Sequence, residues 1–168
     1  MITVKNLHKT FGKTEVLKGI DYHVEKGEKI VIVGPSGSGK STFLRCMNLL
    51  ETPTSGEIWF DGKLITDPKT DINKVREHMG MVFQNFNLFN NLTIMDNIIL
   101  APTKLKLMNK EEAQETALNL LKRVNLTEKA DAYPSQLSGG QRQALTLLMA
   151  TLKKPKLLLL DEHTAALD

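Results

Sequence analysis

The sequence of 168 residues predicts an α/β fold built on buried parallel strands. Two short apolar runs, residues 30–33 and 157–160, are too short for helices and apolar on both faces, as strands covered on both sides must be. A glycine-rich turn and a helical pattern follow the first run, and a longer apolar helix precedes the second. Strands that alternate with helices in this way are typical of parallel sheets.

Composition and charge are those of an ordinary globular protein of one domain. Hydrophobic residues make up 41% and charged residues 24%, which excludes disordered and collagen-like chains. The net charge of +3, from 22 basic and 19 acidic residues without a basic run, is too small to argue for nucleic-acid binding. The sequence has no membrane-span pattern and no secretion signal, and its single cysteine, Cys46, allows no internal disulfide. We therefore expect the chain in the cytoplasm.

Short strands and tight turns are predicted along the first third. Strands are expected at residues 2–4, 16–17, 20–24 and 30–33. The helical spacing of Phe43, Met47 and Leu50 predicts a helix over residues 40–50. Residues 58–60 and 63–65 flank Asp61 and Gly62, a pair that favours the positive φ angles of a hairpin turn.

A helical region is predicted over residues 85–133, after a strand at 79–83. Asn109 and Glu112 have the spacing of a helix-capping box, and an apolar helix face follows them. A final helix over residues 140–154 is apolar for most of 144–152, so we expect it to be buried. Pro155 ends it, ahead of the last strand.

Residues 34–41 fit the pattern G-x-x-x-x-G-K-S/T after a predicted strand and before a predicted helix. In this pattern backbone N–H groups and the helix N-terminus surround phosphate oxygens. Lys40 would reach the outer phosphates, and the Ser41 hydroxyl would ligate Mg²⁺. A glycine turn without a ligand is the alternative, and the position of the Lys-Ser pair argues against it.

Two carboxylates, Asp161 and Glu162, follow the second apolar run, at the strand end where open α/β sheets bind ligands. Asp161 would hold Mg²⁺, and Glu162 would orient and deprotonate an attacking water. Gln84, at the end of its own strand, could complete the magnesium shell or contact the water. An acidic pair at a solvated helix start is the alternative, and the phosphate loop upstream disfavours it.

Residues 137–141, Leu-Ser-Gly-Gly-Gln, open the last helix and form a second potential anion site. One nucleotide does not need two such sites in one chain. Either a second anion binds there, or the site faces a nucleotide held by another copy. Two antiparallel copies about a two-fold axis would bury two nucleotides in an isologous interface.

Together these motifs resemble those of the ATP-binding subunit of ABC transporters, over the whole chain. Residues 34–41 match the Walker A motif, Gln84 the Q-loop, 137–141 the signature, 157–162 the Walker B motif and 165–168 the D-loop. Phe11 stands where the family places an aromatic ring against adenine, and a core phenylalanine is the alternative. Residues 75–89 and 130–134 resemble importers of polar amino acids such as glutamine.

The resemblance implies a P-loop NTPase (RecA-like) core with an antiparallel β subdomain and a helical subdomain. It divides the chain into a core with the β subdomain, residues 1–84 and 134–168, and a helical subdomain, 85–133. The result is a single incomplete ATPase domain without the C-terminal strands of the family. The implied cofactors are ATP and Mg²⁺, with Glu162 and Gln84 catalytic and with Ser41, Gln84 and Asp161 as metal ligands. The implied ATP contacts are Phe11, Gly34, Pro35, Ser36, Gly37, Ser38, Gly39, Lys40, Ser41, Thr42, Ser138, Gly139, Gly140 and Gln141.

The implied function is to couple MgATP hydrolysis to uptake of a polar amino acid at the cytoplasmic face of the membrane. The implied partners are a second ATPase subunit in a head-to-tail dimer, transmembrane permease subunits and, indirectly, an external solute-binding protein, with no nucleic acid. The permease would dock beside Gln84, near Phe86 and Phe89. Aromatic residues at this spacing are equally common in a core.

The sequence departs from the family at its end and in its last helix. It ends at Asp168, before the family's switch histidine, and His163 stands where the family usually has proline. Ala144 and Met149 replace arginines usual in amino-acid importers. We therefore expect poor ATP hydrolysis by the chain alone. A soluble non-transport ABC ATPase and a non-catalytic nucleotide-binding fragment remain alternatives, and the lack of an N-K-x-D segment disfavours a GTPase.

Overall fold

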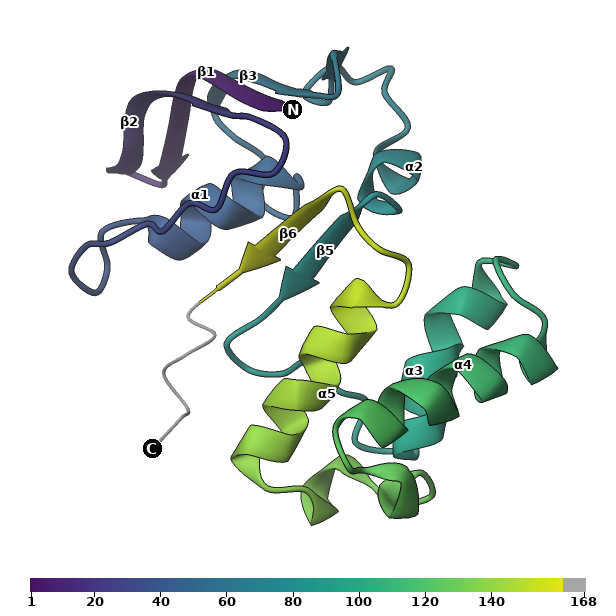
Figure 1. The fold of residues 1–168 in the computed structure, drawn as a ribbon. Helices are drawn as coiled ribbons and strands as arrows, with labels where there is room; N and C mark the ends of the chain where they lie inside the picture. The colour runs from purple at the N-terminus through teal and green to yellow at the C-terminus, as the bar shows by residue number, and fades with distance from the viewer. Residues whose placement is uncertain (162–168) are drawn as a thin grey trace. The chain divides into compact units, whose positions relative to one another are not determined.

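The computed structural model describes residues 1–161, and the predicted α/β class is confirmed (Figure 1). The chain divides into two compact units: the first ends at Gly80, and the second begins at Met81. The first unit contains an antiparallel sheet and two helices, and the second contains the longer helices. Each unit is described by itself below.

A four-stranded antiparallel sheet forms most of the first unit. Its strands are β1 (Ile2–Phe11), β2 (Thr14–Val24), β3 (Ser55–Phe60) and β4 (Lys63–Leu64), in the order β2-β1-β3-β4. The first two strands are longer than the sequence predicted and form one hairpin. The hairpin predicted around Asp61 and Gly62 is confirmed, and these residues have φ angles of 48° and 77°.

A bulge in β1 sets which side chains of that strand are buried. Ile2, Val4 and Leu7 are all buried, so the two-residue alternation of a strand is interrupted between Val4 and Leu7. Asn6 takes a φ of 45° at this point. Gly56 of β3 lies directly against the bulge, where an added Cβ would collide with the backbone of Asn6 and Leu7. This close approach fixes β1 against β3.

The predicted buried strand at residues 30–33 is wrong. These residues have no regular secondary structure, and Val31 and Val33 are 83% and 88% exposed. A strand needs a neighbour for its backbone N–H and C=O groups, and an apolar run does not supply one. The four strands of the first unit pair only among themselves within residues 1–161.

Two helices complete the first unit, α1 (Lys40–Met47) and α2 (Ile72–Arg76). Helix α1 ends earlier than predicted, because Leu49 takes a φ of 53°, and Leu50 is therefore exposed rather than part of a helix face. The sequence analysis missed α2, a short helix that the Asp71 carboxylate caps at the N–H groups of Asn73 and Lys74.

The predicted strands at residues 79–83 and 157–160 form a two-stranded sheet, β5 (Met79–Val82) and β6 (Leu157–Leu160). Their arrows run side by side in the same direction in Figure 1. Burial of β6 is only partial, since Leu159 is 4% exposed and Leu160 is 42% exposed. One face of β6 therefore lacks the cover that the sequence pattern predicted.

The helices of the second unit are α3 (Ile94–Lys104), α4 (Lys110–Arg123) and α5 (Gly139–Thr151), with short 3₁₀ turns at Thr127–Lys129 and Pro134–Gln136. The predicted capping box of α4 is confirmed: the Asn109 side chain accepts from the Glu112 N–H at 2.8 Å, and the Asn109 N–H donates to Glu112 at 3.1 Å. The core of this unit includes Ile94, Ile98, Ala117, Leu121, Leu137 and Leu145. Across residues 1–161, none of the helices is long and apolar enough to cross a membrane.

Asn97 is a buried polar residue that the sequence analysis missed. Its side chain is only 2% exposed and accepts a hydrogen bond from the Phe89 N–H at 2.8 Å. The amide nitrogen donates to the carbonyl oxygens of Phe89, Leu92 and Thr93. Because buried polar groups need partners, this one side chain fixes the loop between Gln84 and α3.

Candidate functional site

The glycine-rich loop at residues 34–39 leads into α1 in the first unit. Gly37 and Gly39 have φ angles of 79° and 93°, which L side chains rarely adopt. Gly39 also packs against β2, because a Cβ there would lie 2.9 Å from Cγ1 of Val16 and 3.2 Å from Cδ2 of Leu17. The positive φ angle and the close approach of β2 both require glycine at the N-cap of α1. The loop therefore packs directly against the sheet.

The ammonium group of Lys40 lies inside this loop. Its Nζ donates to the carbonyl oxygens of Gly34 and Pro35 at 2.8 and 2.9 Å, and the Ser38 N–H donates to the Pro35 oxygen at 3.2 Å. Residues 34–38 are exposed to solvent. Phosphate oxygens are stronger acceptors for an ammonium group than carbonyl oxygens. The loop therefore presents a cation and a helix N-terminus to an anion, which fits the predicted phosphate site.

Phe11 is the last residue of β1 and pairs with Thr14 of β2. Its side chain is 44% exposed, so the alternative interpretation as a core phenylalanine is wrong. Val16, two residues after Thr14, contacts Gly39. The ring and the phosphate loop therefore lie at the same end of the β1–β2 hairpin.

Cys46 lies on the buried face of α1, and its side chain has no exposed surface. Burial raises the pKa of its thiol from the ordinary 9.0 to about 11. The thiolate is the reactive form, so we expect native Cys46 to resist Ellman's reagent at pH 8 and to react fully in urea. The unfolded chain loses this proton first as the pH rises from 9 to 11, so folding stability should fall across that range. Rapid labelling of the native protein would contradict this prediction.

The second unit brings Gln84 and Asp161 to the same end of the β5–β6 sheet. Asp161 follows β6, is 1% exposed and donates its backbone N–H to the Val82 oxygen at 3.0 Å. Gln84 lies two residues beyond Val82 and is exposed. This is the carboxyl end of both strands, where ligands of parallel sheets bind. Glu162, His163 and residues 165–168 lie outside the described residues.

Ser138 is the N-cap of α5, which begins at Gly139, one residue earlier than the predicted helix. Its hydroxyl accepts from the Gln141 N–H at 3.2 Å, and its own N–H donates to Oε1 of Gln141 at 2.9 Å. Ser138 is exposed, and a Cβ added at Gly139 or Gly140 would meet no atom within 4 Å. The N-terminus of α5 is therefore open on the surface of the second unit. Helix α5 itself buries one face, including Leu145 and Leu148.

The sequence analysis missed two cationic side chains that contact aromatic residues singled out above, Phe86 and Phe11. Arg142 of α5 lies over the Phe86 ring at 5.5 Å from its centroid, while Phe89 is 54% exposed. Lys9 of β1 lies over the Phe11 ring at 4.6 Å from its centroid. Neither contact follows from a sequence motif, because each joins residues through the packing of strands or helices.

Comparison with known proteins identifies the family. The model of the family described as ABC transporter matches residues 17–165. The glutamine transport ATP-binding proteins GlnQ of Bacillus subtilis (strain 168) and of Escherichia coli (strain K12) are both 51% identical over the whole chain. So is the arginine transport ATP-binding protein ArtM of Bacillus subtilis (strain 168). The chain covers 69%, 70% and 70% of their respective lengths.

Solved structures agree with this result. The ATP-binding cassette MJ0796, in a dimeric post-hydrolysis state bound to ADP and Pi, matches the whole chain with a TM-score of 0.90 at 38% identity, and 76% of that cassette is covered. A second dimeric structure of MJ0796 matches with a TM-score of 0.89 at 39% identity. The chain therefore belongs to the ABC transporter family, as an ATP-binding protein similar to those of polar amino-acid importers.

Proposed function

We propose that this chain binds and hydrolyses MgATP and thereby drives a membrane importer for a polar amino acid. The observation that supports this most directly is the position of the Lys40 ammonium, which Gly34 and Pro35 hold inside an exposed loop at the N-terminus of α1. ATP phosphates would replace those two carbonyl oxygens as its acceptors. Phe11, half-exposed at the same end of the hairpin, would stack on the adenine.

Magnesium would be held by the Ser41 hydroxyl, the Asp161 carboxylate and Gln84, together with phosphate oxygens. Mg²⁺ usually takes one or two protein carboxylates and completes its shell with phosphates and water, which fits this small donor set. When bound, it would neutralise charge on the outer phosphates. Glu162 would accept the proton of the attacking water at its carboxylate, and Gln84 would orient that water.

The open N-terminus of α5 supports a dimer in which residues 138–141 of one copy bind the nucleotide held by the other. The exposed Ser138 hydroxyl and the uncovered Gly139 and Gly140 leave room for a phosphate from outside the chain. The similar MJ0796 cassettes are dimeric in their solved structures.

We propose that this chain works as part of a transporter at the cytoplasmic face of the membrane. Three proteins that are 51% identical to this chain are ATP-binding proteins of glutamine and arginine transport. We propose that permease subunits dock near Gln84 and the exposed Phe89, and that a solute-binding protein acts through them.

Magnesium-dependent ATP turnover by the purified chain, which we expect to be slow but above background, tests this proposal. We expect Glu162→Gln to reduce turnover to background while ATP binding is retained, because only proton transfer from water is lost. Equal turnover in both proteins would contradict the proposed hydrolysis, and no ATP binding by either would contradict the whole assignment. Loss of glutamine or arginine uptake on deletion of the gene would identify the solute.

A further inference from the structure

Lys9 is a lysine that is almost completely removed from solvent beside Phe11. Its side chain is only 12% exposed, although lysines are rarely buried unless they are paired. The residue lies two positions before Phe11 on β1, and its side chain extends over the Phe11 ring. Its ammonium group is 4.6 Å from the centroid of the Phe11 ring.

Two oxygen atoms fix the position of this ammonium group. Nζ of Lys9 lies 2.6 Å from Oε1 of Glu51 and donates to the backbone oxygen of Thr52 at 2.7 Å. Both acceptors belong to the segment that joins α1 to β3. The Glu51 N–H donates to the Arg45 oxygen at 3.0 Å, which ties this segment to α1, the helix that begins at the phosphate loop.

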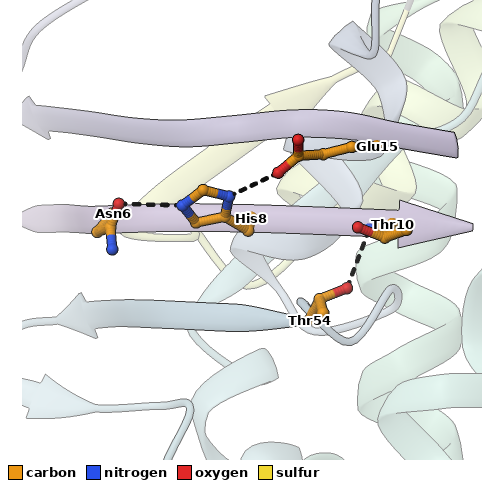
Figure 2. Close-up of polar contacts among 5 residues, drawn as sticks. All are labelled: Asn6, His8, Thr10, Glu15 and Thr54. Atoms are coloured by element: carbon orange, nitrogen blue, oxygen red, sulfur yellow. Dashed lines mark hydrogen bonds and ion pairs between the residues drawn. The ribbon is translucent and has the colours of Figure 1, made fainter.

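Further bonds join the segment to β1 along the edge of the strand that pairs with β3 (Figure 2). The Thr10 N–H donates to Oγ1 of Thr54 at 2.9 Å, and the Thr54 N–H donates to the His8 oxygen at 2.8 Å. Figure 2 also shows His8 beside Glu15 of β2, with 2.8 Å between Nδ1 and Oε1. Residues 8–10 are therefore bonded on both sides, and Lys9 has little freedom to leave the ring.

A cation over an aromatic face is attracted by the negative charge of that face, so Lys9 holds the Phe11 ring in one orientation. The ring remains 44% exposed, which leaves surface for a planar ligand. Preorganising a contact residue improves affinity because its rotamer entropy is lost before the ligand arrives.

We propose that Lys9 is a positioning residue for the nucleotide base: it holds the Phe11 ring so that adenine stacks on the exposed part. This inference rests on the proposed function, in which Phe11 contacts adenine and the loop at residues 34–41 binds the phosphates. Lys9 acts through Phe11 and does not touch the phosphates. Its effect should therefore appear only for ligands that carry a base.

The matched control is Lys5, on the same strand. Its ammonium lies 5.9 Å from the centroid of the Trp59 ring, so Lys5→Met removes a similar cation–aromatic contact away from Phe11. Lys9→Met keeps the length and apolar part of the side chain and removes only the charge. Lys9→Gln is a polar second variant that keeps a donor, and Lys9→Arg keeps the charge.

The experiment compares the affinities of ATP and inorganic tripolyphosphate in each variant by calorimetric titration, with urea unfolding as the check on folding. We expect Lys9→Met and Lys9→Gln to weaken ATP binding by about two- to fivefold, the size of one cation–aromatic contact, and to leave tripolyphosphate binding unchanged. Lys9→Arg should restore ATP binding, and Lys5→Met should change neither affinity. In a Phe11→Ala background, Lys9→Met should have no further effect.

The outcomes separate this inference from the proposed function. Equal losses for ATP and tripolyphosphate, or no loss in either Lys9 variant, would overturn the positioning role while the nucleotide site stands. Unchanged ATP affinity in Phe11→Ala would instead overturn the proposed adenine contact itself. Tripolyphosphate binding alone reports on the phosphate loop in every variant.

Discussion

Replacing Lys40 with alanine is expected to weaken ATP binding by roughly 100-fold. Nζ of Lys40 makes two hydrogen bonds inside the loop, at 2.8 and 2.9 Å, that phosphate oxygens would take over. Each hydrogen bond to a charged group contributes about 1.5 kcal/mol or more, so two of them correspond to about two orders of magnitude in affinity. Titration with a fluorescent ATP analogue measures the loss.

Lys26→Ala is the control for Lys40→Ala. Lys26 is exposed in the turn after β2, in the same unit and with the same charge, so this variant should bind ATP like the unmodified chain. The urea midpoints of both variants should match that of the unmodified chain. If Lys40→Ala retained full ATP affinity, the interpretation of residues 34–41 as a phosphate site would be wrong.

Replacing Gly56 with alanine is expected to destabilise the first unit by about 2–5 kcal/mol. Gly56 has a φ of 100°, and its Cβ would lie 2.7 Å from the Leu7 Cα and 2.8 Å from the Asn6 carbonyl carbon. Overpacking costs about 1–3 kcal/mol and a strained backbone about 1–2 kcal/mol more. Proteins of this size are stable by only about 5–15 kcal/mol, so the loss is a large fraction of the total. The urea midpoint measures it.

Gly62→Ala separates the two causes. Gly62 also has a positive φ, 77°, but an added Cβ would meet no atom within 4 Å. This variant should therefore lose only the 1–2 kcal/mol of backbone strain. Equal midpoints for the two variants would show that the close approach of β3 to the β1 bulge is unimportant for stability.

The local signals in the sequence predicted local structure well. The Asn109–Glu112 capping box and the Asp61–Gly62 turn are both present in the structure. Each depends on residues within a few positions of one another, so the chain itself brings the partners together. The glycine-rich motif is local in the same way, since Gly39 and Lys40 shape the loop that contains them, and its role as a phosphate site stays a prediction.

Structural features that depend on residues far apart in the sequence were predicted wrongly or not predicted at all. Residues 30–33 have the composition of a buried strand, yet Val31 and Val33 are exposed. Asn97 resembles any polar residue of a helix in the sequence, and only folding places the backbone of the preceding loop around its amide.

The sequence by itself determined the family, the glycine-rich turn ahead of α1 and most of the strands and helices, because these reside in contiguous motifs and local periodicity. Only the tertiary structure decided that Phe11 is half-exposed, that Lys9 lies over its ring, and that Asp161 is buried beside Val82. These features depend on strand pairing, which in β1 includes a bulge near Asn6 that shifts the alternation of side chains. The register of strand pairing determines which side chains are buried or in contact, and this register cannot be read from a single sequence.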